Sequence, residues 1–167
     1  MLRTDIVMRR ATPDDNADLI ALAEDVWPVA YAYAGSDYAR HTIDTWWNTE
    51  ANLRSIDQTT MLVAVDGEQI VGMGNIDFRP DVPIIWKLAV HPRYQGWRIG
   101  LALLEKLIAL ANQAPVRLAY AEGNEQAARF YASYGFEPIG RNEPEQPGWP
   151  GQVRVEWRPR QQPRSAH

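Results

Sequence analysis

One strand–helix–strand unit constrains the fold of this chain more than any other part of its sequence. Pro83 to Val90 is an apolar, strand-like run, apolar residues then recur at helical spacing from about Arg98 to Asn112, and Val116 to Glu122 is again strand-like. A connection of this length joins two parallel neighbouring strands through a right-handed crossover. Because ligands in such sheets bind at the carboxyl ends of the parallel strands, we expect a binding site at this edge.

The other segments predict antiparallel strands and further helices around this unit. Strand-like runs cover residues 6–10, 61–65, 69–73, 136–140 and 152–157, and Asp66-Gly67 is typical of a tight hairpin turn. One helix should begin at Thr12-Pro13, and another should run from Ser36 or Asp37 to about Asn48. A last helix should span Asn124 to Tyr134 and end at Gly135. The residues expected to face the core from the helix over 98–112 are Ile99, Leu103, Leu107, Leu110 and Ala111.

These elements predict a single domain of the α+β or mixed α/β class over residues 4–158. Its sheet should be mixed, twisted and mostly antiparallel, with about seven strands flanked by helices. A length of 167 residues fits one domain with a proper core. Residues 159–167 are rich in Pro, Gln and Arg, and we predict a disordered tail there.

Composition excludes several classes of function. The chain has no cysteine, which removes disulfides, cysteine-ligated zinc and a cysteine nucleophile. Its three histidines lie far apart and show no metal-ligand spacing, so we expect no metal. A formal net charge of −4 argues against nucleic-acid binding, and no apolar run is long enough to suggest a membrane span. The expected location is cytoplasmic, and a homodimer is left open.

Two phrases flank the expected binding edge. Residues 90–100, Val-His-Pro-Arg-Tyr-Gln-Gly-Trp-Arg-Ile-Gly, join a strand to a helix through a glycine-containing turn. Such a turn points several backbone N–H groups and the positive end of the helix dipole at one spot, which suits a phosphate. The second phrase, residues 124–136, holds Tyr131, a phenol with an ordinary pKa of about 10. The two phrases indicate a nucleotide-tailed cofactor whose reactive end meets a tyrosine acid.

The two phrases resemble the GNAT superfamily of acyl-CoA-dependent N-acyltransferases, and the resemblance covers about residues 6–140. The family's Val-x-Pro and Arg/Gln-x-x-Gly-x-Gly/Ala turn is matched by Val90, Pro92, Gln95 and Gly100, with Arg98 in place of the middle glycine. The family's second phrase is matched by Asn124, Ala127, Phe130, Tyr131, Gly135 and Phe136. The resemblance implies a GNAT-like fold, acetyl-CoA as co-substrate, and a parallel strand pair splayed around the CoA cleft.

The resemblance also implies roles for individual residues. Leu88 and Val90 would pair with the pantetheine amides through their backbone, and the Leu88 N–H would polarise the thioester carbonyl. Asn124 and Ala127 would lie along the pantetheine arm, and Tyr131 would protonate the departing thiolate. Since an arginine can adopt helical φ, we expect the amide of residue 98 to point inward. The turn that would hold the pyrophosphate comprises Gln95, Gly96, Trp97, Arg98, Ile99, Gly100 and Leu101.

Each of these features also has a simpler interpretation. A glycine-containing turn before a helix is often only a turn. Tyr131 on an apolar helix face is also typical of a core tyrosine, and Asn124 could serve only as the cap of its helix. The functional interpretation depends on the two phrases occurring together, in order and at the right separation.

The mechanism follows from the nucleophiles that the chain lacks. Without a cysteine or a Gly-x-Ser-x-Gly elbow, direct attack of a primary amine on the acetyl thioester is the simplest reaction. An alkyl amine must lose a proton before or during attack. The candidate bases are Asp77, at the end of the hairpin, and Glu122, at the end of a central strand, although either could be a solvated charge.

The acceptor is predicted from a stretch in which aromatic residues and carboxylates crowd together. Aromatic faces and carboxylates suit a cationic amine, which favours a small, polyamine-like acceptor. Packing aromatics beside a solvated helix face are the alternative. A protein or peptide N-terminus is a rival acceptor, and a CoA-binding sensor without transfer is a rival function, supported by Arg98 at the glycine position. The residues of the stretch are Trp27, Tyr31, Tyr33, Tyr38, Trp46 and Trp47, with Asp37, Asp44 and Glu50.

Overall fold

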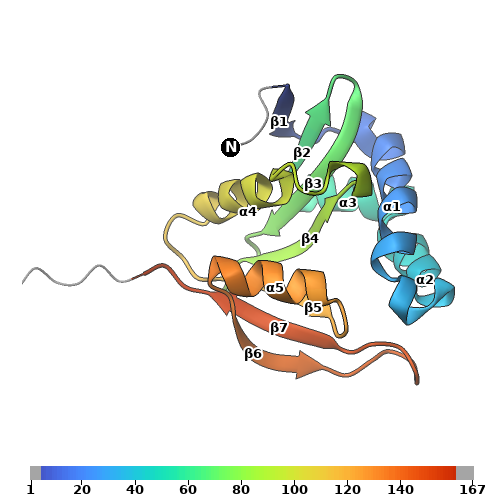
Figure 1. Ribbon diagram of the computed structural model, residues 1–167. Coiled ribbons are helices and arrows are strands. Elements are labelled where there is room, and N and C mark those ends of the chain that lie inside the picture. Colours follow the sequence, from blue (N-terminus) through green and yellow to red (C-terminus); the bar gives the residue numbers. More distant parts are fainter. Residues whose placement is uncertain (1–4, 161–167) are drawn as a thin grey trace, which may run out of the picture.

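A seven-stranded mixed sheet, in the order β1-β2-β3-β4-β5-β7-β6, runs through the computed structural model, which describes residues 5–160 (Figure 1). β4 and β5 pair in parallel, and the other neighbouring strands in this range pair antiparallel. The expected fold class is therefore confirmed. The strands are β1 (Ile6–Arg10), β2 (Thr60–Asp66), β3 (Gln69–Asp77), β4 (Ile84–Val90), β5 (Val116–Ala121), β6 (Glu137–Asn142) and β7 (Gln152–Trp157).

Helices cover both faces of the sheet (Figure 1). One face carries α1 (Asn16–Ala30), α2 (Ser36–Trp46) and α3 (Thr49–Gln58), and the other carries α4 (Ile99–Leu110) and α5 (Glu125–Tyr134). Short 3-10 turns occur at η1 (Pro13–Asp15), η2 (Ala32–Ala34) and η3 (Pro92–Tyr94). Within residues 5–160, we find no helix with the length and apolar character that a membrane crossing requires.

Each face of the sheet has its own apolar core. Leu22 of α1 packs with Met73 of β3 on the first face, and Leu107 of α4 packs with Ile85 of β4 on the second. The approach of α4 to β3 is close at Gly74, because a Cβ there would lie 2.8 Å from Leu107 Cδ1 and would force this side chain to shift. These two layers hold β4 from both sides and thereby position the edge at which it separates from β5.

Local details differ from the expectations in three places. The sequence pattern did not indicate α3, whose cap is Asn48: its side chain accepts a hydrogen bond from the Ala51 N–H at 2.8 Å. Leu110, expected in the core, is 47% exposed because α4 ends at this residue. The hairpin turn is centred on Gly67 and Glu68, one residue later than expected, and Gly67 provides the positive φ of 62°. Residue 4 and tail residues 161–167 lie outside the described range.

Candidate active site

β4 and β5 separate after a short parallel pairing. Their register comprises Ile84 with Arg117 and Ile85 with Leu118. Beyond these pairs, residues of both strands line one cavity of about 1040 Å³. The cavity therefore lies at the carboxyl ends of the parallel strands, where the crossover predicted a binding site.

The backbone of β4 directs polar groups into this opening. The N–H of Lys87 donates to Asn75 Oδ1 at 2.9 Å, and the N–H of His91 donates to the Val71 carbonyl at 2.8 Å, so both face β3. Backbone groups alternate in direction along a strand. Those of Leu88 and Val90 therefore face away from β3, toward the cavity that both residues line.

The turn after β4 ends in the N-terminus of α4. The N–H groups of Ile99, Gly100 and Leu101 form the first helical turn and have no intrahelical acceptor. These residues line the cavity, as do Gln95, Gly96 and Arg98. Donors that converge at a helix N-terminus form a seat for an anion such as the pyrophosphate of CoA.

Arg98 has a backbone conformation that the sequence did not predict. Its φ of 64° and ψ of 20° lie in the left-handed region, so the expectation of helical φ is wrong. The physical reason is the turn itself, which enters α4 through a residue that glycine would occupy without steric cost. The side chain of Arg98 is exposed at the α4 end of the cavity, where it can add positive charge.

The turn is held in place by three polar contacts. His91 Nδ1 accepts from the Arg93 N–H at 3.1 Å, and His91 Nε2 lies 3.2 Å from Asp25 Oδ2 on α1. The Tyr94 hydroxyl donates to Asp66 Oδ2 at 2.6 Å. Trp97, expected among the cofactor residues, packs its ring against Tyr94 with centroids 4.6 Å apart and is not among the cavity residues.

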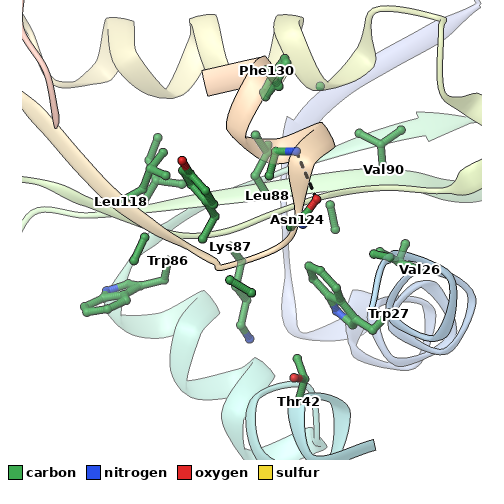
Figure 2. Close-up of a pocket in the computed structure, with 18 of the residues that line it drawn as sticks. Val26, Trp27, Thr42, Trp86, Lys87, Leu88, Val90, Leu118, Asn124 and Phe130 are labelled. Carbon is green, nitrogen blue, oxygen red and sulfur yellow. Dashed lines mark hydrogen bonds between the residues drawn. The ribbon is translucent and has the colours of Figure 1, made fainter. Parts of the chain in front are cut away.

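Tyr131 and Asn124 come from the second phrase, and both line the cavity. Burial raises the pKa of the Tyr131 phenol above its usual value, so the hydroxyl stays protonated at neutral pH and carries a proton that it can donate. Asn124 Oδ1 caps α5 by accepting from the Ala127 N–H at 3.1 Å (Figure 2). The amide nitrogen of Asn124 keeps two donors for a ligand, and Ala127 lies beside it on the cavity wall.

Asp77 and Glu122, the expected bases, are engaged elsewhere and are not among the cavity residues. Asp77 is 2% exposed; it accepts from Arg79 Nη2 at 2.9 Å and from Trp86 Nε1 at 3.0 Å. The Arg79 guanidinium, followed by the Trp86 N–H, lowers the pKa of Asp77 far below its usual value. Glu122 Oε1 accepts from Arg141 Nε at 2.6 Å. Neither carboxylate is placed to receive a proton from a ligand in the cavity.

Aromatic residues from α1, from α2 and from the positions directly after these helices line the other half of the cavity. We call this the acceptor half, and its aromatic members are Trp27, Tyr31, Tyr38, Trp46 and Trp47. Trp27 stacks on Tyr31 with centroids 4.9 Å apart, and Tyr31 lies 4.8 Å from Tyr38. Tyr33, the remaining member of the expected aromatic stretch, instead donates its hydroxyl to the Glu122 carbonyl at 3.0 Å.

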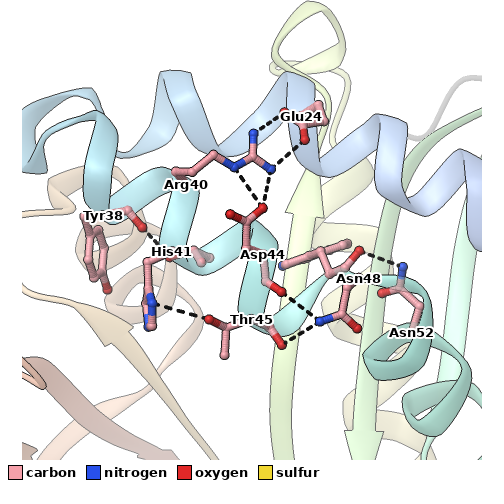
Figure 3. Close-up of polar contacts among 10 residues, drawn as sticks. Glu24, Tyr38, Arg40, His41, Asp44, Thr45, Asn48 and Asn52 are labelled. Atoms are coloured by element: carbon pink, nitrogen blue, oxygen red, sulfur yellow. Dashed lines mark hydrogen bonds and ion pairs between the residues drawn. The ribbon is translucent and has the colours of Figure 1, made fainter.

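The carboxylates of the same stretch face solvent. Figure 3 shows Arg40 between Asp44 and Glu24, with Nε donating to Asp44 Oδ1 at 2.9 Å and Nη2 donating to Glu24 Oε1 at 2.7 Å. Glu50 is 89% exposed at its side chain and lies 3.7 Å from Arg54. Asp37 is also exposed, and none of the three expected carboxylates is among the cavity residues. The expected carboxylate cradle for a cationic amine is therefore absent from this cavity.

Lys87 and Glu145 are cavity residues to which the sequence analysis gave no role. Lys87 belongs to β4, and Glu145 belongs to the loop between β6 and β7, residues 143–151. Desolvation, with a smaller effect of Arg54, lowers the pKa of Lys87 to about 8. The alternation of β4 was a usable signal for Lys87, since neighbours of Leu88 must point to the opposite face. No local pattern marked Glu145.

This sheet, the opening between β4 and β5, and the anion seat at α4 define a CoA-dependent acyltransferase of the mixed-sheet class. The model of the Acetyltransferase (GNAT) family matches residues 17–136, and the chain therefore belongs to this family.

Solved structures of acetyltransferases share the fold. The PaiA N-acetyltransferase of Thermoplasma acidophilum, solved in complex with coenzyme A, superimposes with a TM-score of 0.81 at 20% identity, over 92% of this chain and 98% of that one. A GCN5-related N-acetyltransferase of Rhodopseudomonas palustris gives a TM-score of 0.78 at 20% identity, over 95% and 98% of the two chains. Among curated proteins, the histone acetyltransferase TAP1 of Glycine max is 40% identical over 53 residues, which are 32% of this chain and 23% of that protein.

Proposed function

We propose that the protein transfers the acetyl group of acetyl-CoA directly to a primary amine of a small molecule. The main observation in support is that Leu88 and Val90, the first turn of α4 and Tyr131 all line one cavity. These groups suit, in order, the pantetheine arm, the pyrophosphate and the leaving sulfur of one extended cofactor. Acetyl-CoA supplies an activated thioester, and the protein aligns it with the amine.

The transfer proceeds without an acyl-enzyme, because the chain has no cysteine. The amine nitrogen attacks the thioester carbonyl carbon while the Leu88 N–H stabilises the developing negative oxygen. The carbon–sulfur bond then breaks, and the Tyr131 hydroxyl gives its proton to the CoA thiolate. Asn124 and Ala127 line the pantetheine arm on the α5 side.

Glu145 takes the place of Asp77 and Glu122 as the candidate base. No other described residue that lines the cavity carries a carboxylate. Glu145 belongs to the loop 143–151, on the side of the acceptor half. His41 Nε2 lies 3.0 Å from Glu145 Oε2, which orients the carboxylate. A Glu145→Gln variant should lower kcat/KM for the amine by at least tenfold at neutral pH.

A small molecule suits this cavity better than an extended peptide. The loop 143–151 closes against α2, where Trp149 packs on Tyr38 with centroids 5.6 Å apart and on His41 with centroids 4.8 Å apart. The contact between His41 and Glu145 joins the same two segments. This contact between the loop and α2 covers one side of the acceptor half, and an extended peptide would need an open groove there.

The function is tested by measuring thiol release from acetyl-CoA with an amine panel that includes polyamines, aminoglycosides, amino acids and short peptides. We expect release with small amines and calorimetric binding of CoA to the free protein. Binding of CoA without turnover of any amine or peptide would favour the CoA-sensor alternative. Turnover confined to peptides would identify a peptide N-terminal acetyltransferase instead.

A further inference from the structure

Lys87 places a positive charge inside the acceptor half. Figure 2 shows its side chain leaving β4 between Trp86 and Trp27 and pointing toward Thr42. Its ammonium group donates to the Trp46 carbonyl and lies 4.6 Å from the centroid of the Trp47 ring. An ammonium group has three donors, so the Trp46 carbonyl leaves it able to bind a ligand that enters the cavity.

This charge has no anionic partner in the described part of the chain. The ion pairs found among residues 5–160 do not include Lys87. The charged neighbour that acts on it is Arg54, also a cavity residue and also positive, whose own carboxylate neighbour is the exposed Glu50 at 3.7 Å. Arg79 lines the cavity as well, but Asp77 neutralises it. Burying an unpaired ammonium group is costly, so the cavity favours a ligand that brings a negative charge.

The aromatic wall beside Lys87 also holds a donor without an acceptor. The indole Nε1 of Trp27 is buried and has no hydrogen-bond partner among the described residues. Trp27 lies 5.9 Å from Trp47, the ring over which the Lys87 ammonium group sits. A buried donor without an acceptor is destabilising, so an acceptor that reached Trp27 Nε1 would stabilise this wall.

We propose that the acceptor is an aromatic or large apolar amine that carries a carboxylate, and that Lys87, supported by Arg54, binds this carboxylate. The proposal rests on the proposed acetyl transfer and names the substrate class of that same site. The rings of Trp27, Tyr31 and Trp47 would pack against the apolar body of the substrate. The free base of its amine would then face the thioester, with Glu145 on the loop side.

This substrate class replaces the polyamine-like acceptor favoured by the sequence. A polyamine would bring further positive charge beside Lys87 and Arg54. Asp44 and Glu50 lie outside the cavity, which leaves Glu145, on the loop side, as the carboxylate among the cavity residues that could offset it. Like charges in a partly desolvated site repel each other, so spermidine should be a poor acceptor.

The test uses pairs of amines that differ only in the carboxylate: tryptophan against tryptamine, and tyrosine against tyramine, with spermidine as the polycation. For each we would measure kcat/KM by thiol release, and also the calorimetric Kd on protein saturated with CoA. We expect the carboxylated member of each pair to be preferred at least tenfold by both measurements. In Lys87→Met this preference should fall to within about twofold, with KM rising for tryptophan and unchanged for tryptamine.

Arg54→Gln should reduce the preference partially, and Lys106→Met, an exposed lysine on α4, should leave it unchanged. Equal or better turnover and binding of the decarboxylated amines would overturn the proposal while leaving acetyl transfer intact. An undiminished preference in Lys87→Met would overturn the role of this lysine. If no amine is acetylated, the proposed transfer fails, and the calorimetric ranking on the CoA-saturated protein still decides whether the cavity selects a carboxylate.

Discussion

The rings of Tyr131 and Tyr120 stack nearly parallel, with centroids 6.0 Å apart and an interplanar angle of 17°. Phe136 contacts Tyr131 edge-on at 5.5 Å. The ring of Tyr131 is thus fixed by packing on α5 and β5, independently of its hydroxyl. Removal of the hydroxyl alone should therefore leave the fold in place and isolate the chemistry of the phenol.

Tyr131→Phe should lower turnover by about 100-fold to 10,000-fold, the usual contribution of a positioned proton donor. The affinity for acetyl-CoA should hardly change, because the lost interaction belongs to the transition state. Steady-state rates and calorimetry check the two halves of this prediction. The matched control is Tyr134→Phe on the same helix, outside the cavity residues. Turnover within twofold of the parent in Tyr131→Phe would return Tyr131 to a purely structural role.

Gly100→Val should weaken CoA binding by at least tenfold without unfolding the protein. A Cβ on Gly100 would lie 3.5 Å from Val90 Cγ2 and 3.7 Å from Phe130 Cζ, which are ordinary contacts. The branched methyl groups, however, would stand where the pyrophosphate approaches the first turn of α4. Ala109→Val, on the exposed side of the same helix, controls for the lower helix propensity of valine. Equal CoA affinity in the two variants would move the anion seat away from this turn.

Arg98→Gly should not destabilise the protein, although most substitutions by glycine do. The left-handed φ of 64° costs an arginine about 1 kcal/mol, which offsets the greater chain entropy of glycine. Arg98→Val should lower the free energy of unfolding, because a β-branched residue tolerates this region least. Urea denaturation of both variants measures the difference. A clear loss of stability in Arg98→Gly would mean that the side chain of Arg98 stabilises the turn.

The pKa of Lys87 predicts a pH dependence of stability. Its value in the folded protein is lowered to about 8 from 10.5, so between these values the unfolded chain binds more protons than the folded one. The contribution of Lys87 therefore makes stability rise with pH through this window, by about 3 kcal/mol at most. Below pH 8 both states are protonated, and the cost of burying the charge is present in full.

Unfolding free energies of the parent and Lys87→Met, measured by urea denaturation from pH 7 to 10.5, test this sign. The variant should be more stable than the parent by the largest margin at pH 7, and the margin should shrink as the pH rises. Lys106→Met, an exposed lysine, should show no such trend. A margin independent of pH would mean that Lys87 has a nearly ordinary pKa in the folded protein.

The parts of the site that depend on local sequence were predictable. Apolar periodicity located the crossover. The two phrases that hold Gly100 and Tyr131 predicted a shared site, and both residues line the same cavity. The left-handed φ of Arg98 could not be predicted from the residue type, because the turn imposes it on an arginine. The glycine that the family has at this position was the signal that pointed to it.

The acceptor half was predicted poorly because it depends on long-range packing. Lys87 meets Trp47 across 40 positions of sequence, and Glu145 reaches the cavity from a loop without any motif. Asp44 is held on the exposed side of α2 by Arg40, one turn earlier in the helix.

The closure of loop 143–151 on α2 means that the two halves of the cavity are encoded in different parts of the chain. The residues of the proposed acetyl-CoA site lie within the single stretch 88–131. The walls of the acceptor half come largely from residues 26–59 and from this loop. Substitutions in the outer segments could therefore change the acceptor without altering the residues of the proposed cofactor site. Exchange of this loop between relatives is accordingly the shortest route to a changed substrate range.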